Sequence, residues 1–290
     1  MTKLFQYFSY RQYIKNFIIF LPLFFENIFF LNTFFLLSKY ILVFISLCIA
    51  AQSVYILNDY KDKKNDKIIG KNNIFNNIEG KISNKNVFLS FCLMNFINII
   101  ILTYLVQISK NIVLLVLFYY FINIFYNYFF KRIKYIDIFC IATLYVIRIL
   151  IGIEILDGNE YYIDSILFIF MGSLLLLSSK RYIYSAKQSL FNNVENNIYK
   201  EIEIKNLLII FTFLLNLFSI YFLFFENGQM INTNITPNIF LFLLIVYTSY
   251  TYSKSTLKKN LSLDIVKNLM KISFSIPITI FIILYIYTNT

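Results

Sequence analysis

Long runs of apolar residues follow one another along the chain, separated by short polar stretches. A helix that crosses a membrane needs about 20 apolar residues, and nine runs approach this length. They lie near residues 14–31, 37–57, 87–108, 112–130, 135–154, 163–180, 206–224, 238–253 and 270–288. Polar residues interrupt the region from 17 to 57, so eight spans remain an alternative. The pattern predicts an all-α polytopic membrane protein with about nine transmembrane helices, forming a single integral membrane domain over residues 1–290.

The composition supports this class of protein. Of the 290 residues, 59% are hydrophobic and 20% aromatic, whereas soluble domains are roughly 45–50% apolar. The chain has no histidine, which excludes a histidine base or a histidine metal ligand. Its three cysteines lie singly in different apolar runs, and we interpret them as packing residues. The first run lacks a small-residue cleavage site, so we expect a retained helix rather than a signal peptide.

Basic residues cluster in alternate segments between the predicted spans. Cytoplasmic loops of membrane proteins are enriched in lysine and arginine, so this distribution predicts a cell (inner) membrane protein with a cytoplasmic N-terminus and an external C-terminus. Two long inner loops, about 60–86 and 181–205, would cap the cytoplasmic mouth of the bundle. This topology accounts for most of the net charge of +11, so we expect no nucleic-acid partner.

Three aspartates and an asparagine follow the second apolar run, in the pattern Asn58-Asp59-x-x-Asp62-x-x-x-Asp66. At helical spacing they fall within roughly one quarter of the helix circumference. Like charges three and four residues apart repel each other unless water or a cation lies between them. Oxygen ligands of this kind favour Mg²⁺ shared with a substrate diphosphate. The alternative is a solvated helix end on which neighbouring lysines pair with the acids.

Several other side chains are candidates for binding phosphate groups. Arg148 lies inside the fifth apolar run, where a cation is costly unless it is paired or faces a wet cavity. Asp137 lies three helical turns earlier at nearly the same azimuth, so both would point into one cavity; a structural ion pair with another helix is the alternative. The inner ends of other runs carry Lys15, Asn16, Lys131, Lys180 and Arg181. Such residues are either positive-inside anchors or, if the bundle brings them opposite the acidic face, phosphate ligands.

These residues resemble the motifs of a known family. The acidic motif at the inner end of the second helix is similar to that of the UbiA superfamily of intramembrane prenyltransferases. Other elements resemble its polyprenyl-phosphate (decaprenyl-phosphate) phosphoribosyltransferase branch, and the similarity extends from residue 11 to about 190. Arg11-Gln12-Tyr13-Ile14-Lys15-Asn16 resembles R-P-x-Q-W-x-K-N, the segments 130–137 and 148–152 resemble L-K-x-x-x-x-x-D and R-x-x-x-G, and Lys180-Arg181 resembles the start of K-R-x-x-E.

The resemblance implies a UbiA-like bundle with a cytoplasm-facing cavity and an enzyme that moves a phosphoribosyl group from phosphoribosyl pyrophosphate to a polyprenyl phosphate. In that case Asp59, Asp62 and Asp66 are the catalytic residues, and they hold Mg²⁺ on the leaving diphosphate. Asn58 orients this cluster. The residues that bind the substrates are then Asn58, Lys15, Asn16, Lys131, Arg148, Lys180 and Arg181.

Quinone and haem prenyltransferases of this superfamily carry a second aspartate-rich motif after the sixth helix. Here that segment has Glu195, Glu201 and Glu203 but no D-x-x-x-D, which favours a phosphoribosyl donor. The chain departs from the branch because most basic positions after Asp66 are missing and Tyr184 replaces the glutamate of K-R-x-x-E. The open alternatives are a prenyltransferase with a prenyl diphosphate donor and another acceptor, an inactive lipid-binding homologue, and a transporter.

Overall fold

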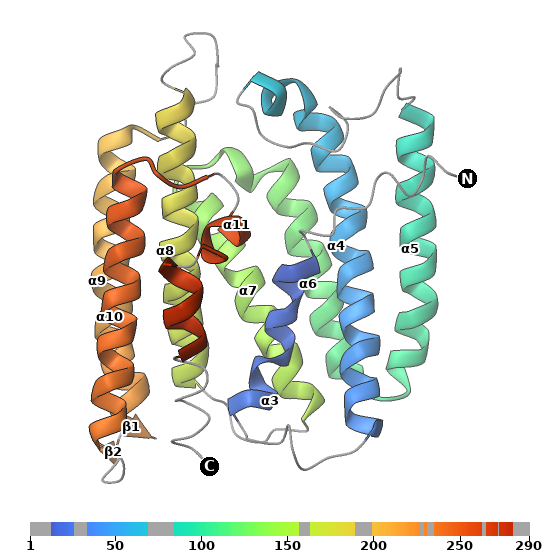
Figure 1. The fold of residues 1–290 in the computed structure, drawn as a ribbon. Helices are drawn as coiled ribbons and strands as arrows, with labels where there is room; N and C mark the ends of the chain where they lie inside the picture. The colour runs from blue at the N-terminus through green and yellow to red at the C-terminus, as the bar shows by residue number, and fades with distance from the viewer. Residues whose placement is uncertain are drawn as a thin grey trace. The chain divides into compact units, whose positions relative to one another are not determined.

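The computed structural model describes residues 13–25, 34–68, 84–156, 163–188, 199–226, 229–230, 235–262, 265–271 and 273–280. Nearly all of these residues are helical (Figure 1), which confirms the all-α class. The helices are η1 (Ile14–Phe20), α3 (Leu21–Phe25), α4 (Phe34–Ile68), α5 (Asn84–Val106), α6 (Lys110–Tyr128), η4 (Phe130–Arg132), α7 (Ile136–Ile155), α8 (Ile163–Gln188), α9 (Glu201–Phe224), α10 (Ile235–Leu257) and α11 (Ile265–Leu269). Strands β1 (Phe225–Glu226) and β2 (Gln229–Met230) form a short antiparallel pair between α9 and α10.

Among the described residues, six helices are long and apolar enough to cross a membrane. Their candidate spans are Leu36–Lys63, Asn84–Val106, Lys110–Tyr128, Ile136–Ile155, Ile166–Ala186 and Glu201–Tyr221. These match the second to seventh predicted runs, so the chain is an integral membrane protein. The described part of the first run is a shorter apolar helix, Ile14–Leu23; the eighth run coincides with α10, and much of the ninth lies outside the described residues. The count of nine and the orientation in the membrane stay predictions.

Contacts divide the chain into two compact units. The first comprises Met1–Leu23, Leu31–Ile133 and Ile147–Asn159, and the second comprises Phe24–Phe30, Lys134–Val146 and Glu160–Thr290. Helix α7 belongs to both, because its first half lies in the second unit and its second half in the first. The single domain over residues 1–290 stays a prediction.

Helix α4 is the central element of the first unit and packs against η1, α5 and α6 (Figure 1). The apolar part of α4 has one buried face, which includes Tyr40, Val43, Leu47 and Val54. These residues recur at helical spacing. Its 35 residues give a length of about 52 Å at 1.5 Å per residue, whereas the hydrocarbon core of a bilayer is about 30 Å thick. Helix α4 is therefore longer than the membrane core is thick, and its polar C-terminal turns carry the acidic motif.

Helix η1 approaches α7 closely in the first unit. A Cβ atom at Gly152 would lie 2.2 Å from the carbonyl oxygen of Ile19 and 3.0 Å from Cγ of Pro22. The Tyr40 hydroxyl donates a hydrogen bond to the Gly152 carbonyl oxygen at 2.6 Å. Only a residue without a side chain allows the two backbones to come this close.

Replacing Gly152 with alanine is therefore expected to destabilise the protein. The new methyl group meets a backbone oxygen that moves only with η1 itself, and overpacking of this kind costs about 1–3 kcal/mol of unfolding free energy. Gly172→Ala is the matched control, because a Cβ atom there would have its nearest neighbour, Leu215 Cδ1, at 4.0 Å. Denaturant titration in detergent would measure both. Equal losses from the two variants would contradict the close approach.

In the second unit, α8, α9 and α10 pack side by side (Figure 1). Their shared core consists of buried apolar side chains that include Leu174, Tyr182, Phe211, Leu215 and Tyr252. Hydrogen bonds also join these helices: Ser249 Oγ donates to Asn216 Oδ1 at 2.9 Å, and Ser179 Oγ to the Tyr252 hydroxyl at 3.1 Å. Polar contacts of this type hold helices together where lipid leaves no hydrophobic driving force between them.

Two ion pairs fasten the start of α9. Lys134 Nζ lies 2.6 Å from Glu203 Oε2, and Lys259 Nζ lies 3.0 Å from Glu201 Oε1. Hydrogen bonds to these carboxylates raise the pKa of Lys134 and of Lys259 above the usual lysine value. The side chains of both pairs are between 33% and 53% exposed, so each pair contributes little to stability. They connect α9 to the start of α7 and to the end of α10.

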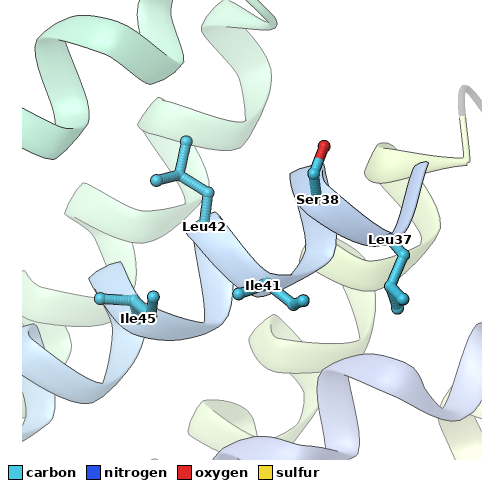
Figure 2. A pocket seen from close by; sticks show the side chains of 5 residues that line it. All are labelled: Leu37, Ser38, Ile41, Leu42 and Ile45. Carbon is cyan, nitrogen blue, oxygen red and sulfur yellow. The ribbon is translucent and has the colours of Figure 1, made fainter. Parts of the chain in front are cut away.

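An apolar hollow of about 200 Å³ lies along α4 and is lined by Leu37, Ser38, Ile41, Leu42 and Ile45. Figure 2 shows these five side chains on successive turns of the one helix. From Ile45 to Asn58 the helix rises about 20 Å. The hollow is therefore far from the acidic motif, and its lining combines one hydroxyl, that of Ser38, with apolar side chains and no charged group.

Candidate functional site

The predicted acidic face lies on the last turns of α4. Asn58, Asp59, Asp62 and Asp66 all belong to this helix, so the predicted helical spacing holds. Asp59 is buried, with 8% of its surface exposed, and Asn58 and Asp62 are partly exposed. The side chain of Asp66 lies outside the described residues. The three described side chains form what we call the acidic face.

Lys131 reaches the acidic face from η4. Helix α6 ends at Tyr128, and the single turn of η4 follows before the backbone becomes extended at Ile133. This turn places Lys131 Nζ 3.0 Å from Asn58 Oδ1 and in an ion pair with Asp62 Oδ2. The structure thus places Lys131 beside the acidic face. From the sequence, this arrangement was required if Lys131 is to be a phosphate ligand rather than an anchor. Its role in binding a substrate stays a prediction.

The oxygens of the acidic face suit a hard cation. Asn58 and Asp62 already hold one positive charge, the Lys131 ammonium, and Asp59 adds a third side chain with oxygen ligands. In the part of the chain that the structure describes, no cluster of three acidic or cysteine side chains could enclose a metal by itself. Mg²⁺ does not need such a cage, because it usually takes one or two carboxylates and completes its shell with water and substrate phosphates. The donor set therefore fits Mg²⁺.

Lys15 lies near the acidic face as well. Its Nζ is 5.7 Å from the centre of the Tyr55 ring, a cation–π contact. Tyr55 precedes Asn58 and Asp59 by three and four residues on α4, so the three side chains are neighbours on the helix surface. The predicted binding residue Lys15 is thus placed one turn from the acidic face.

Arg148 and Asn16 contact each other inside the first unit. Arg148 is 3% exposed; its Nε donates to Asn16 Oδ1 at 2.8 Å and its Nη2 to the Tyr119 hydroxyl at 2.8 Å. The guanidinium also lies 4.8 Å from the centre of the Tyr119 ring. Asn16 is fully buried and donates from Nδ2 to Cys48 Sγ at 3.2 Å. Both residues are therefore engaged with protein groups.

Asp137 and Arg181 form an ion pair in the second unit. Arg181 Nε lies 2.6 Å from Asp137 Oδ2, and the Tyr199 hydroxyl donates a hydrogen bond to Asp137 Oδ1. The same hydroxyl accepts from the Tyr135 backbone N–H at 2.6 Å, and Tyr135 adopts a left-handed conformation with φ of 68°. Burial, followed by the bond to Asp137, raises the pKa of Tyr199 above the usual tyrosine value. Tyr199 was missed from the sequence, because nothing local marks it among 24 tyrosines.

The remaining predicted binding residues have separate surroundings. Asp137 and Arg148 lie on one helix, but their contacts belong to different units, so the single cavity predicted for them stays a prediction. Lys180 is partly exposed on α8 beside Arg181. Both lie in the second unit, whereas the acidic face lies in the first. Their predicted position opposite the acidic face also stays a prediction.

Comparison with known proteins identifies the family of the chain. The model of a family described as the UbiA prenyltransferase family matches residues 20–190. This range includes the acidic face, Lys131, Arg148 and the Lys180-Arg181 pair, and it begins just after Asn16. Among curated proteins, no sequence matches the chain.

Proposed function

Since the chain belongs to the UbiA prenyltransferase family, we propose that it transfers a phosphoribosyl group from phosphoribosyl pyrophosphate to a polyprenyl phosphate. The family assignment makes it an intramembrane transferase of the prenyltransferase type. The identity of the donor and of the acceptor is the part that we propose.

The main support for this proposal is the positive charge at the inner end of α8. A prenyl diphosphate donor in this superfamily is associated with a second acidic motif after the sixth membrane helix. Near this position the structure describes Lys180 and Arg181 on α8, and Arg181 Nε lies 2.6 Å from Asp137 Oδ2. The described acids that follow, Glu201 and Glu203 on α9, pair with lysines. Basic side chains at this position suit a second phosphorylated substrate, such as a polyprenyl phosphate, better than a second metal.

The reaction is a substitution at C1 of the ribose. An oxygen of the polyprenyl phosphate forms a bond to C1, the bond between C1 and the diphosphate oxygen breaks, and diphosphate leaves with the electron pair. The attacking phosphate is already an anion at neutral pH, so no residue has to remove a proton. This agrees with a chain that has no histidine, because positioning and charge stabilisation can supply most of the rate enhancement.

Asp59 and Asp62 of the acidic face, together with Asp66, would hold Mg²⁺, and Asn58 would orient the cluster. When bound, Mg²⁺ would neutralise negative charge on the leaving diphosphate. Lys131 already lies on this face and has a flexible side chain, so it can exchange its contact with Asp62 for one with the diphosphate. Lys180 and Arg181 would bind the phosphate of the lipid, whose chain would extend between the apolar helices.

A donor comparison tests the proposal. Purified protein with Mg²⁺ would be given either labelled phosphoribosyl pyrophosphate and polyprenyl phosphate, or a labelled prenyl diphosphate and aromatic acceptors. We expect lipid-linked label from the first mixture. Product from the second mixture alone would favour the prenyltransferase that the family description suggests. Absence of product from both mixtures, where a reference enzyme works, would favour an inactive lipid-binding homologue.

A further inference from the structure

We propose that Arg148 is a positioning residue, which holds Asn16 so that the ammonium of Lys15 lies beside the acidic face. The inference rests on the proposed function, because the group that Lys15 would meet there is the diphosphate of the donor. It assigns Arg148 a different role from the direct phosphate contact that the sequence predicts.

The surroundings of Arg148 point to an internal role. The side chain is 3% exposed, and two of its nitrogens donate to the neutral oxygens of Asn16 and Tyr119. The guanidinium carbon also lies over the Tyr119 ring, 4.8 Å from its centre. A phosphate ligand has to present its N–H groups to an open cavity. Here Nε is directed at Asn16 of η1 and Nη2 at Tyr119 of α6.

Two residues of α7, one turn apart, hold η1 in place. Arg148 binds Asn16, and Gly152 provides the space into which the backbone of Ile19 fits. Because residues four apart lie on the same face of a helix, both contacts come from one side of α7. The amide nitrogen of the same Asn16 donates to Cys48 Sγ of α4 at 3.2 Å. Helix η1 is thus held between α7 and α4.

The position of Asn16 determines the direction of Lys15. In a 3₁₀-helix each residue turns by about 120°, so fixing one residue sets the azimuth of the next. Lys15 Nζ accordingly lies 5.7 Å from the Tyr55 ring, one turn before Asn58 and Asp59 on α4. Without the contact between Arg148 and Asn16, the side chain of Lys15 should no longer be held beside Tyr55.

A cross-linking experiment tests the positioning without any substrate. Lys15→Cys and Tyr55→Cys would be introduced together with Cys92→Ser and Cys140→Ser, while Cys48 is kept because it contacts Asn16. A short bismaleimide should join positions 15 and 55 when Arg148 is present. Arg148→Gln should reduce the cross-link to background, and Arg132→Gln, which removes an exposed arginine, should not.

Asn16 provides a second, nearly isosteric pair of variants in case Arg148→Gln fails to fold. Asn16→Asp keeps an oxygen that accepts from Arg148 and should preserve the cross-link, whereas Asn16→Leu should abolish it. A cross-link that survives both Arg148→Gln and Asn16→Leu would overturn the proposal. Because this result needs no turnover, it is independent of whether phosphoribosyl pyrophosphate is the donor.

Kinetics distinguish positioning from a purely structural role. Lys15→Ala and Arg148→Gln should each raise KM for the diphosphate donor about tenfold, the effect of one lost charge-assisted contact, with kcat nearly unchanged. The double variant should resemble Lys15→Ala, because both changes remove the same contact. Fully multiplicative effects would overturn the proposal and favour a direct phosphate contact by Arg148. If no donor is turned over, binding of Mg²⁺ with inorganic diphosphate replaces KM.

Discussion

Replacing Asp62 with asparagine is expected to lower the transfer rate by about 10²–10³-fold, the usual cost of removing one electrostatic contact with a developing charge. Asparagine has nearly the same shape, so the change removes charge from the acidic face without opening a cavity. It weakens the hold on Mg²⁺ and also deprives Lys131 of its ion pair. Initial rates with the labelled donor, measured at several Mg²⁺ concentrations, would quantify the loss.

Glu154→Gln is the matched control for Asp62→Asn. Glu154 lies in the same unit, and its Oε1 accepts a hydrogen bond from Asn111 Nδ2 at 2.9 Å. Glutamine keeps an oxygen at this position, so activity should change little. Higher Mg²⁺ should restore part of the activity of Asp62→Asn if the acidic face holds the metal. Activity of Asp62→Asn equal to that of Glu154→Gln would remove the acidic face from the mechanism.

The parts of the site that were predictable depend on local spacing. An apolar run long enough to cross a membrane is followed directly by Asn58, Asp59 and Asp62, so the acids were expected at the polar end of the same helix. Lys131 follows the apolar run of α6 directly, so a place at the helix end was predictable. A place opposite the acidic face was one of two alternatives for Lys131, because the sequence does not show which helix ends lie side by side.

The parts that were not predictable depend on contacts between distant segments. The oxygen that Arg148 binds belongs to Asn16, 132 residues away in the chain, and Tyr199 lies 62 residues from Asp137. A buried charge shows from the sequence that a partner is needed, but a neutral amide or a phenol can satisfy it as well as an acid or a phosphate. Arg148 was therefore predicted to bind phosphate, whereas its described contacts are with protein groups.

Breaking the ion pair between Arg181 and Asp137 is expected to destabilise the protein asymmetrically. Asp137 is fully buried, whereas the Arg181 side chain is 18% exposed. In Arg181→Met the aspartate loses its cation inside the protein, and leaving a buried charge without its partner costs about 3–5 kcal/mol of unfolding free energy. In Asp137→Asn the amide can still accept from Tyr199, and Arg181 can turn toward water. The loss should then be about 1 kcal/mol, that of one hydrogen bond.

The double variant separates this explanation from a simple loss of packing. Once Asp137→Asn has removed the buried charge, Arg181→Met should cost far less than it does alone, so the two losses should not add. Lys134→Met, which breaks the exposed pair with Glu203, should leave the unfolding midpoint unchanged because surface pairs contribute little. A larger loss from Asp137→Asn than from Arg181→Met would show that the carboxylate, rather than its pairing, stabilises this unit.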